Sequence, residues 1–164
     1  MKIIKVKTDS KNYDIKVGHD LLGSTPLKKL VSQKDILLIV DNKVPELLIN
    51  KLKNNLKKSS SKKINSIKIN ASENNKNMSY LAKVYDFLIR NNYSRDCVIF
   101  GVGGGITCDM TGFIASTFLR GVDFVLVPTT LLSQVDASIG GKTGVNHKGF
   151  KNMIGTFNQP VQVI

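Results

Sequence analysis

The residues best suited to chemistry begin at a run of three glycines, Gly103–Gly105, within the segment GVGGGITCD (101–109). These glycines follow an aliphatic strand pattern and precede a helical one, so a ligand can approach the backbone closely there, and free N–H groups at the helix start favour a pyrophosphate. The dinucleotide fingerprint GxGxxG is not matched, because its last position is occupied by Ile106 or Cys108, depending on which glycine is taken as the first. A strand-to-helix turn without a ligand therefore stays open beside phosphate or dinucleotide binding.

A second glycine motif, GGKTG (140–144), has part of the pattern of a P-loop. A P-loop also needs a glycine separated by four residues from the Gly-Lys-Thr, and Asp136 stands at that position. A carboxylate there would repel the phosphates that such a loop cradles. The motif also lies well past the nearest predicted strand, which ends at Val127. The sequence therefore argues against a nucleoside triphosphatase.

Polar side chains accumulate after residue 128, in a segment that is otherwise rich in glycine and aliphatic residues. Two lysines among them, together with Arg120 upstream, suit an anionic substrate that carries carboxylate or phosphate. A solvent-exposed loop is the alternative, although the flanking apolar residues argue against full exposure. The polar residues are Thr129, Thr130, Gln134, Asp136, Lys142, Asn146, Lys151 and Asn152.

The elements that must position these residues alternate between strand and helix patterns. Continuous aliphatic runs predict buried strands, and apolar residues at i, i+3, i+4 and i+7 predict helices. We predict strands at 3–7, 13–17, 36–40, around 67–69, at 97–102 and at 123–127, and helices over 20–31 (interrupted by Pro26), 45–57, 78–89 and roughly 106–118.

This alternation predicts an α/β fold, with a Rossmann-like, mainly parallel sheet, flanking helices and an N-terminal β-hairpin. Ligands of such sheets bind beyond the carboxyl ends of the strands. Asp41, the glycines and Thr129 each follow a predicted strand at such an end. We expect the last forty residues to be rich in loops. A strand begins at VQVI (161–164), and this ending suggests a truncated chain.

Composition excludes several classes of protein. Hydrophobic residues make up 41% of the 164 residues and charged residues 22%, which is ordinary for a globular domain and excludes a disordered or fibrous chain. The longest aliphatic run, at 36–40, is far shorter than a membrane span, and lysines interrupt the apolar residues of the N-terminus. Cys97 and Cys108 form neither a CxxC pair nor a disulfide framework. We therefore expect a reduced, cytoplasmic protein without membrane attachment.

The net charge of +12 raises the question of nucleic acid. Only Arg90, Arg95 and Arg120 are arginines, whereas arginine is the better side chain for bidentate phosphate recognition. The densest stretch, 51–68, holds seven lysines, no acid and no aromatic residue. A solvated face is favoured over a nucleic-acid site, and an absent acidic segment that offsets the charge is a second possibility.

The segment from Gly101 to Asn146, followed by KNMIGTFNQP (151–160), resembles the signature of the 3-dehydroquinate synthases. The resemblance is dense over roughly 97–164 and looser but colinear before it. Other sugar-phosphate cyclases share the glycine turn, the PTTLL stretch (128–132) and the Lys-Asn pair. The GGKTGVN run (140–146) favours the dehydroquinate branch.

The resemblance implies roles residue by residue. Glu73 and Lys76 match a GExxK loop in which Ser72 replaces the usual glycine, and Phe150 replaces a glycine before the Lys-Asn pair, so we expect Gly149 to absorb that turn. The implied NAD-binding residues are Asp41, Ala71, Ser72, Glu73, Asn74, Asn75, Lys76, Gly103, Gly104, Gly105, Ile106, Thr107, Cys108, Asp109, Thr129, Thr130, Lys142 and Lys151. The implied substrate-binding residues are Arg120, Asp136, Lys142, Lys151 and Asn152, of which Asp136, Lys142 and Asn152 would be catalytic.

The resemblance also implies an activity, the conversion of 3-deoxy-D-arabino-heptulosonate 7-phosphate to 3-dehydroquinate and phosphate in the shikimate pathway. It implies catalytic NAD+ and a divalent metal, zinc or cobalt. His19 and His147 are far apart in sequence, so we expect no metal ligands in this chain. The resemblance implies that the metal ligands lie in an all-helical C-terminal domain that is absent here.

We therefore expect residues 1–164 to be the NAD-binding α/β domain of a truncated enzyme. It would be inactive alone, and a homodimer when full length. Another sugar-phosphate cyclase and a stand-alone NAD-binding module stay open as alternatives.

Overall fold

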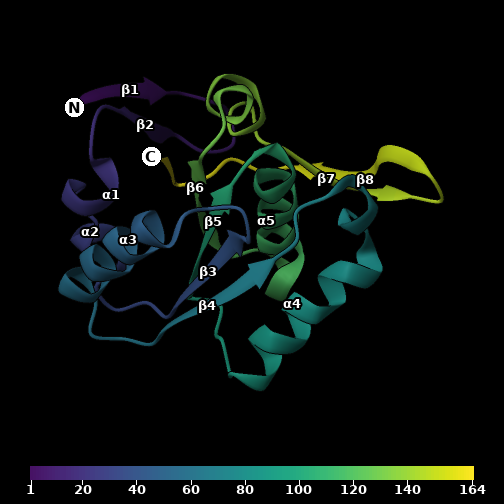
Figure 1. Cartoon of the computed structure of the whole chain (residues 1–164), viewed down its shortest axis with the longest axis horizontal. Coiled ribbons are helices and arrows are strands. Elements are labelled where there is room, and N and C mark those ends of the chain that lie inside the picture. The colour runs from purple at the N-terminus through teal and green to yellow at the C-terminus, as the bar shows by residue number, and fades with distance from the viewer.

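A seven-stranded sheet forms the middle layer of the structure, a computed structural model that describes all residues from 1 to 164 (Figure 1). The strand order is β1-β2-β9-β6-β5-β3-β4. Only β1 and β2 run antiparallel, as an N-terminal hairpin, and every other neighbouring pair is parallel. The predicted α/β class, with a mainly parallel sheet, is confirmed.

The strands of this sheet are β1 (Lys2–Val6), β2 (Tyr13–Val17), β3 (Ile36–Asp41), β4 (Ile64–Ile69), β5 (Val98–Gly103), β6 (Asp123–Pro128) and β9 (Gln162–Val163). The helices are α1 (Leu21–Ser24), α2 (Lys28–Val31), α3 (Glu46–Ser59), α4 (Met78–Arg90) and α5 (Gly105–Thr117). Shorter turns are the 3-10 helices η1 (Glu73–Asn75) and η2 (Phe118–Arg120) and the π-helix η3 (Ser133–Ala137).

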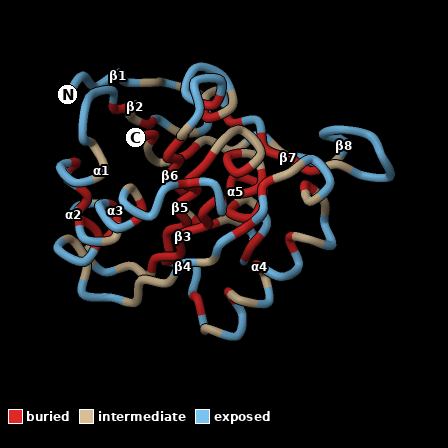
Figure 2. Tube along the Cα trace, viewed as in Figure 1, coloured by how far each residue is buried: buried red, intermediate tan, exposed pale blue.

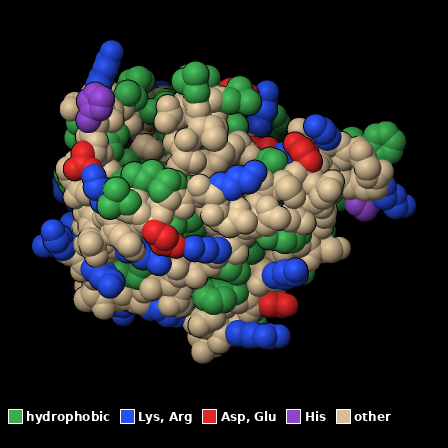
Figure 3. All heavy atoms as spheres, viewed as in Figure 1, with side chains coloured by type: hydrophobic (Ala, Val, Ile, Leu, Met, Phe, Trp, Pro, Cys, Tyr) green, Lys and Arg blue, Asp and Glu red, His purple; other side chains and the backbone are tan.

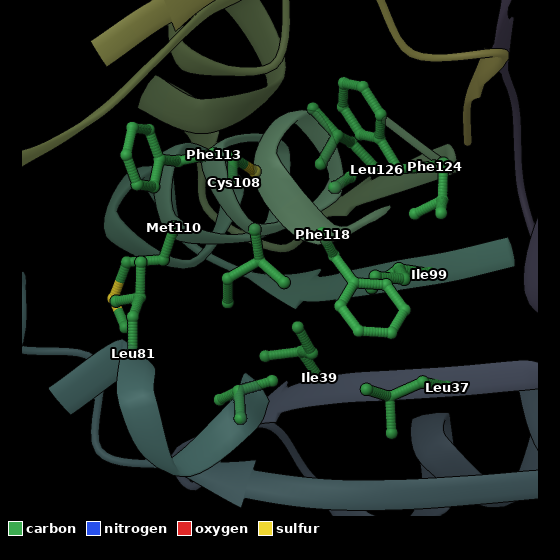
Figure 4. Close-up of a cluster of buried hydrophobic side chains, with 14 of the residues drawn as sticks. Leu37, Ile39, Leu81, Ile99, Cys108, Met110, Phe113, Phe118, Phe124 and Leu126 are labelled. Atoms are coloured by element: carbon green, nitrogen blue, oxygen red, sulfur yellow. The ribbon is translucent and has the colours of Figure 1, made fainter. Parts of the chain in front are cut away.

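Two hydrophobic cores lie on the two faces of the sheet. Alternate side chains of β3 point to opposite faces, so Leu37 and Ile39 belong to the core under α4 and α5, whereas Leu38 belongs to the core under α2 and α3. The red segments of Figure 2 follow the central strands and α5, and Figure 4 shows the α5 side chains Met110 and Phe113 in the first of these cores. Because both faces are covered, the central strands are continuously apolar, as their sequences predicted.

A second, two-stranded antiparallel sheet holds β7 (Lys142–His147) and β8 (Phe150–Phe157) and projects from the domain (Figure 1). The expectation of a loop-rich C-terminal segment was wrong here. Glycine and asparagine have weak strand propensity, so the local sequence carried little strand signal. Tertiary packing supplies it instead, since Thr143 and Val145 are buried and β7 lies against α5.

Candidate functional site

The candidate site begins at a crevice between β3 and β5. The helices that follow these adjacent strands pack on opposite faces of the sheet, which leaves the crevice open at the carboxyl ends. Gly103 at the end of β5 meets Asp41 at the end of β3. A Cβ atom on Gly103 would lie 2.4 Å from Thr107 Oγ1 and 3.0 Å from Asp41 Cβ. Only glycine fits this contact.

The start of α5 lies at this crevice without a cap. Gly104 precedes the helix and has no side chain to accept from its first N–H groups. The first helical hydrogen bond is donated by the N–H of Cys108 to the carbonyl of Gly104 (3.0 Å), so the N–H groups of residues 105–107 have no partner in the chain. These donors and the helix dipole fit a pyrophosphate, so the residues present suit a dinucleotide.

Thr129 and Thr130 border the glycine turn on its other side. The N–H of Thr129 donates to the carbonyl of Gly103 (2.9 Å), which joins the end of β6 to the end of β5. A Cβ atom on Gly104 would lie 3.3 Å from Thr130 Cγ2. The structure therefore brings both threonines to the predicted cofactor position.

A buried lysine connects three segments of the site. Lys76 is only 4% exposed, and its Nζ lies 2.5 Å from Asp109 Oδ2 and 2.5 Å from Asn152 Oδ1. Burial raises the pKa of Asp109, and the hydrogen bond from Lys76 opposes that rise only in part. Residues 76, 109 and 152, predicted from three separate motifs, thus form one polar cluster.

A cavity of about 590 Å³ opens beside this cluster. Four predicted site residues line it: Asp109, Asp136, Lys142 and Asn152. Its remaining wall comes mostly from the loop after η3 and from the β7–β8 sheet. The predicted substrate residues, apart from Arg120 and Lys151, therefore share one hollow next to the glycine turn.

Lys151 and the loop that contains Glu73 do not line this cavity. They meet at a second hollow beside the β7–β8 hairpin. Lys151 Nζ is 3.8 Å from Glu73 Oε1, and Asn146 Nδ2 donates to Glu73 Oε2 (2.9 Å). Asn146 was noted in the sequence as polar but was assigned no role. The only available signal was its position directly after the GGKTGV run.

Several other predicted residues have plain structural positions. Ser72 is extended (φ −130°), so this position of the loop does not require glycine. Asn74 borders a polar hollow with Lys151, and Asn75 Nδ2 donates to the carbonyl of Asn70 (2.9 Å). Gly149 has a φ of +82° and takes the hairpin turn before β8, as expected.

Three predicted residues are not brought to the crevice. Arg120 follows the far end of α5 and lines a separate hollow with Arg95 and Asp123. Ala71 and Cys108 belong to the hydrophobic core, and burial raises the pKa of the Cys108 thiol to about 12. Because the N–H of Cys108 is already bonded, this residue has no free group for a cofactor.

Lysines of the basic stretch 51–68 are partly paired with acids from other segments. Lys51 bonds Asp20, Lys63 bonds Asp35 and Lys68 bonds Glu46. Figure 3 shows Lys and Arg side chains scattered over the visible face, with no concentrated patch. The geometry thus favours a solvated face over a nucleic-acid surface.

No three His, Cys, Asp or Glu side chains come close enough together to hold a metal ion. His19 and His147 are both exposed and belong to different parts of the fold. None of the helices has the length and apolar character needed to cross a membrane.

Solved structures with this fold identify the class of protein. A 2-deoxy-scyllo-inosose synthase superposes with a TM-score of 0.89 at 22% identity, over 99% of this chain and 46% of that one. A 2-epi-5-epi-valiolone synthase from Streptomyces hygroscopicus, solved with NAD+ and Zn2+ bound, gives a TM-score of 0.82 at 30% identity, over 99% of this chain and 44% of that one. Fold and site together define an α/β domain of the sugar-phosphate cyclase type.

Sequence comparison then gives the family. A profile of the 3-dehydroquinate synthase N-terminal region matches residues 66–164. The 3-dehydroquinate synthases of Pelagibacter ubique and Blochmanniella floridana are each 43% identical to this chain, over 98% and 99% of its length. The chain belongs to the 3-dehydroquinate synthase family, as its N-terminal region. It spans 44% of the length of either relative.

Proposed function

We propose that this chain is the NAD+-binding part of a 3-dehydroquinate synthase, which converts 3-deoxy-D-arabino-heptulosonate 7-phosphate to 3-dehydroquinate and phosphate. One observation carries the proposal. The uncapped start of α5 adjoins the Lys76–Asp109–Asn152 cluster, and a cavity lined by Asp136 and Lys142 opens next to both. The identity to curated 3-dehydroquinate synthases supports the choice of substrate.

The cofactor would lie across the carboxyl ends of β3 and β5. Its pyrophosphate would accept hydrogen bonds from the N–H groups of residues 105–107, and Asp41 and Thr130 would flank it on either side. The loop that holds Glu73 and Lys76 would close the crevice from the direction of α4. When bound, NAD+ would supply the chemistry of accepting a hydride and returning it.

The substrate would occupy the cavity beside the cofactor. Lys142 and Asn152 line that cavity and would hold the phosphate by charge and hydrogen bonding. Asp136 would accept hydrogen bonds from substrate hydroxyls on the opposite wall. These side chains would orient the reacting carbons toward the cofactor and hold the leaving phosphate in place.

Calorimetric titration of the chain with NAD+, with ATP as the comparison ligand and at physiological salt, tests the proposal. We expect saturable binding of NAD+ and much weaker binding of ATP. Equal affinity for NAD+ and ATP, or no binding of NAD+, would contradict the proposed NAD+-binding function of this chain. We expect no turnover of the sugar phosphate by the 164 residues alone.

A substitution in the glycine turn makes the test specific. Gly104 has the extended backbone of an N-cap (φ −78°, ψ −170°), so Gly104→Asp should cap α5, which offsets the tight 3.3 Å contact of its Cβ with Thr130 Cγ2, while its carboxylate blocks the anion position. We expect NAD+ binding to fall at least tenfold without loss of folding. The matched control is Ser79→Asp, which adds the same charge to the first turn of α4 and should leave NAD+ binding unchanged.

A further inference from the structure

Asn146, in the middle of the β7–β8 hairpin, bonds three residues of the proposed site. Its Nδ2 donates to Glu73 Oε2 (2.9 Å) and to the Glu73 carbonyl (3.2 Å). Its backbone N–H donates to the carbonyl of Lys76 (2.7 Å), and its Oδ1 accepts from the N–H of Asn152 (2.9 Å). One half-buried side chain thus joins the loop after β4 to Asn152 near the start of β8.

The bond to Asn152 has a consequence for the cavity. Asn152 has a left-handed backbone (φ 55°), which asparagine tolerates better than most residues. Its N–H donates to Asn146 Oδ1, and its Oδ1 accepts from Lys76 Nζ. These two hydrogen bonds orient the residue. Its Nδ2 has no acceptor within the chain, and Asn152 lines the cavity. The arrangement leaves one oriented donor available to a ligand.

The residue type at position 146 follows from these contacts. A carboxamide offers a donor to the Glu73 carboxylate and an acceptor to the Asn152 N–H at once. Aspartate would keep the acceptor but would place a second carboxylate against Glu73. The cations near that hollow, Lys148 and Lys151, are both exposed and would offset the repulsion only in part. Alanine would offer neither group.

We propose that Asn146 is a positioning residue that holds the Glu73–Lys76 loop in the arrangement that binds NAD+ and orients Asn152 toward the substrate cavity. The inference rests on the proposed function, because it concerns the same site. Asn146 would act through Glu73, Lys76 and Asn152 rather than by contact with the cofactor.

Three variants of the chain test this role: Asn146→Ala, Asn146→Asp and the control Asn91→Ala. The control removes one side-chain amide hydrogen bond away from the site, from Asn91 Nδ2 to the carbonyl of Phe87 (2.8 Å), at the far end of α4. Each variant is titrated with NAD+, and hydrogen exchange at the Asn152 N–H is measured by nuclear magnetic resonance. Thermal unfolding verifies that each variant is folded.

We expect Asn146→Ala to bind NAD+ about tenfold more weakly and to speed exchange at Asn152 several-fold. Asn146→Asp should restore the slow exchange at Asn152, because its carboxylate still accepts that hydrogen bond, while NAD+ binding stays weakened by repulsion of Glu73. Asn91→Ala should change neither readout.

The two proposals fail in distinguishable ways. Unaltered NAD+ binding by Asn146→Ala, or weaker binding without faster exchange at Asn152, would overturn the positioning role alone. Absence of NAD+ binding by the unaltered chain would overturn the proposed function together with this inference.

Discussion

Lys76 Nζ lies 2.5 Å from Asp109 Oδ2, and this ion pair joins the loop after β4 to the first turn of α5. The lysine side chain is 5% exposed and the aspartate side chain 22%. Such a pair is expensive to break on one side only, because the remaining charge stays in a poorly solvated place. The same pair joins two of the segments that are proposed to bind the cofactor.

Lys76→Met should therefore destabilise the fold by about 3 kcal/mol, since it leaves Asp109 without its partner. Urea unfolding at pH 7 measures the change. Part of the loss should return in Lys76→Met/Asp109→Leu, where both charges are absent. Lys83→Met serves as control, because Lys83 lies over the Tyr80 ring on the outer surface. Equal stability of Lys76→Met and the unaltered chain would contradict the importance of this ion pair.

Gly112→Ala should also destabilise the chain, although this exchange inside a helix usually stabilises it. A Cβ atom on Gly112 would lie 2.3 Å from Thr143 Cγ2, where α5 packs against β7. We expect a loss of about 1–3 kcal/mol in urea unfolding, from overpacking. Adding Thr143→Ser should relieve the clash and keep the hydroxyl bond to the carbonyl of Thr156. Gly23→Ala in α1, where the nearest atom is 3.6 Å away, is the control and should be tolerated.

The stability contributed by Asp123 should depend on pH. Burial alone would raise the pKa of Asp123, but hydrogen bonds from Lys11 and Lys34 hold it below its ordinary value. Its contribution is therefore present above pH about 3.9 and is lost as the pH falls through the lowered pKa.

Asp123→Asn should accordingly cost about 1 kcal/mol at pH 7, a modest value because all three side chains are roughly one-third exposed. The difference from the unaltered chain should shrink as the pH falls below about 3.9 and through the lowered pKa of Asp123. Urea unfolding at a series of pH values measures it. If the difference in unfolding free energy between Asp123→Asn and the unaltered chain grew as the pH fell, the ion pairs with the two lysines would not be the source of the stability.

Both thiols should be unreactive in the folded chain. Burial raises the pKa of Cys97 to about 11 and that of Cys108 to about 12, so little thiolate exists at pH 8. We expect a disulfide reagent to react at least about a hundredfold more slowly than with free cysteine. In denaturant, two thiols per chain should react rapidly. Fast labelling of the folded chain would contradict the burial of these two thiols.

Several parts of this domain could be predicted from the sequence because their signals are local. Continuous aliphatic runs such as the one at 36–40 mark a strand covered on both faces, and the apolar spacing in residues 78–89 marks a helix. The glycine run at 103–105 marks a backbone that a ligand or a neighbouring side chain approaches closely. The cofactor site was predicted at this turn for that reason, together with the family resemblance.

Other features depended on contacts between residues distant in the sequence. The β7–β8 hairpin has little strand propensity, and its packing against α5 decides its structure. The family resemblance implied a cofactor role for Cys108, but α5 turns its side chain into the core, because only one face of a helix can meet the crevice.

By itself, the sequence determined which residue types follow each strand, and hence the fold class and the position of the crevice. The tertiary structure decided which of those residues meet. Lys76, Asp109 and Asn152 come from three segments, and Asn146 holds two of these segments together. Arg120 lies at the other end of α5, away from them. The physical reason is that a parallel sheet gathers strand ends at one edge, whereas packing of the helices and the hairpin sets which side chains touch there.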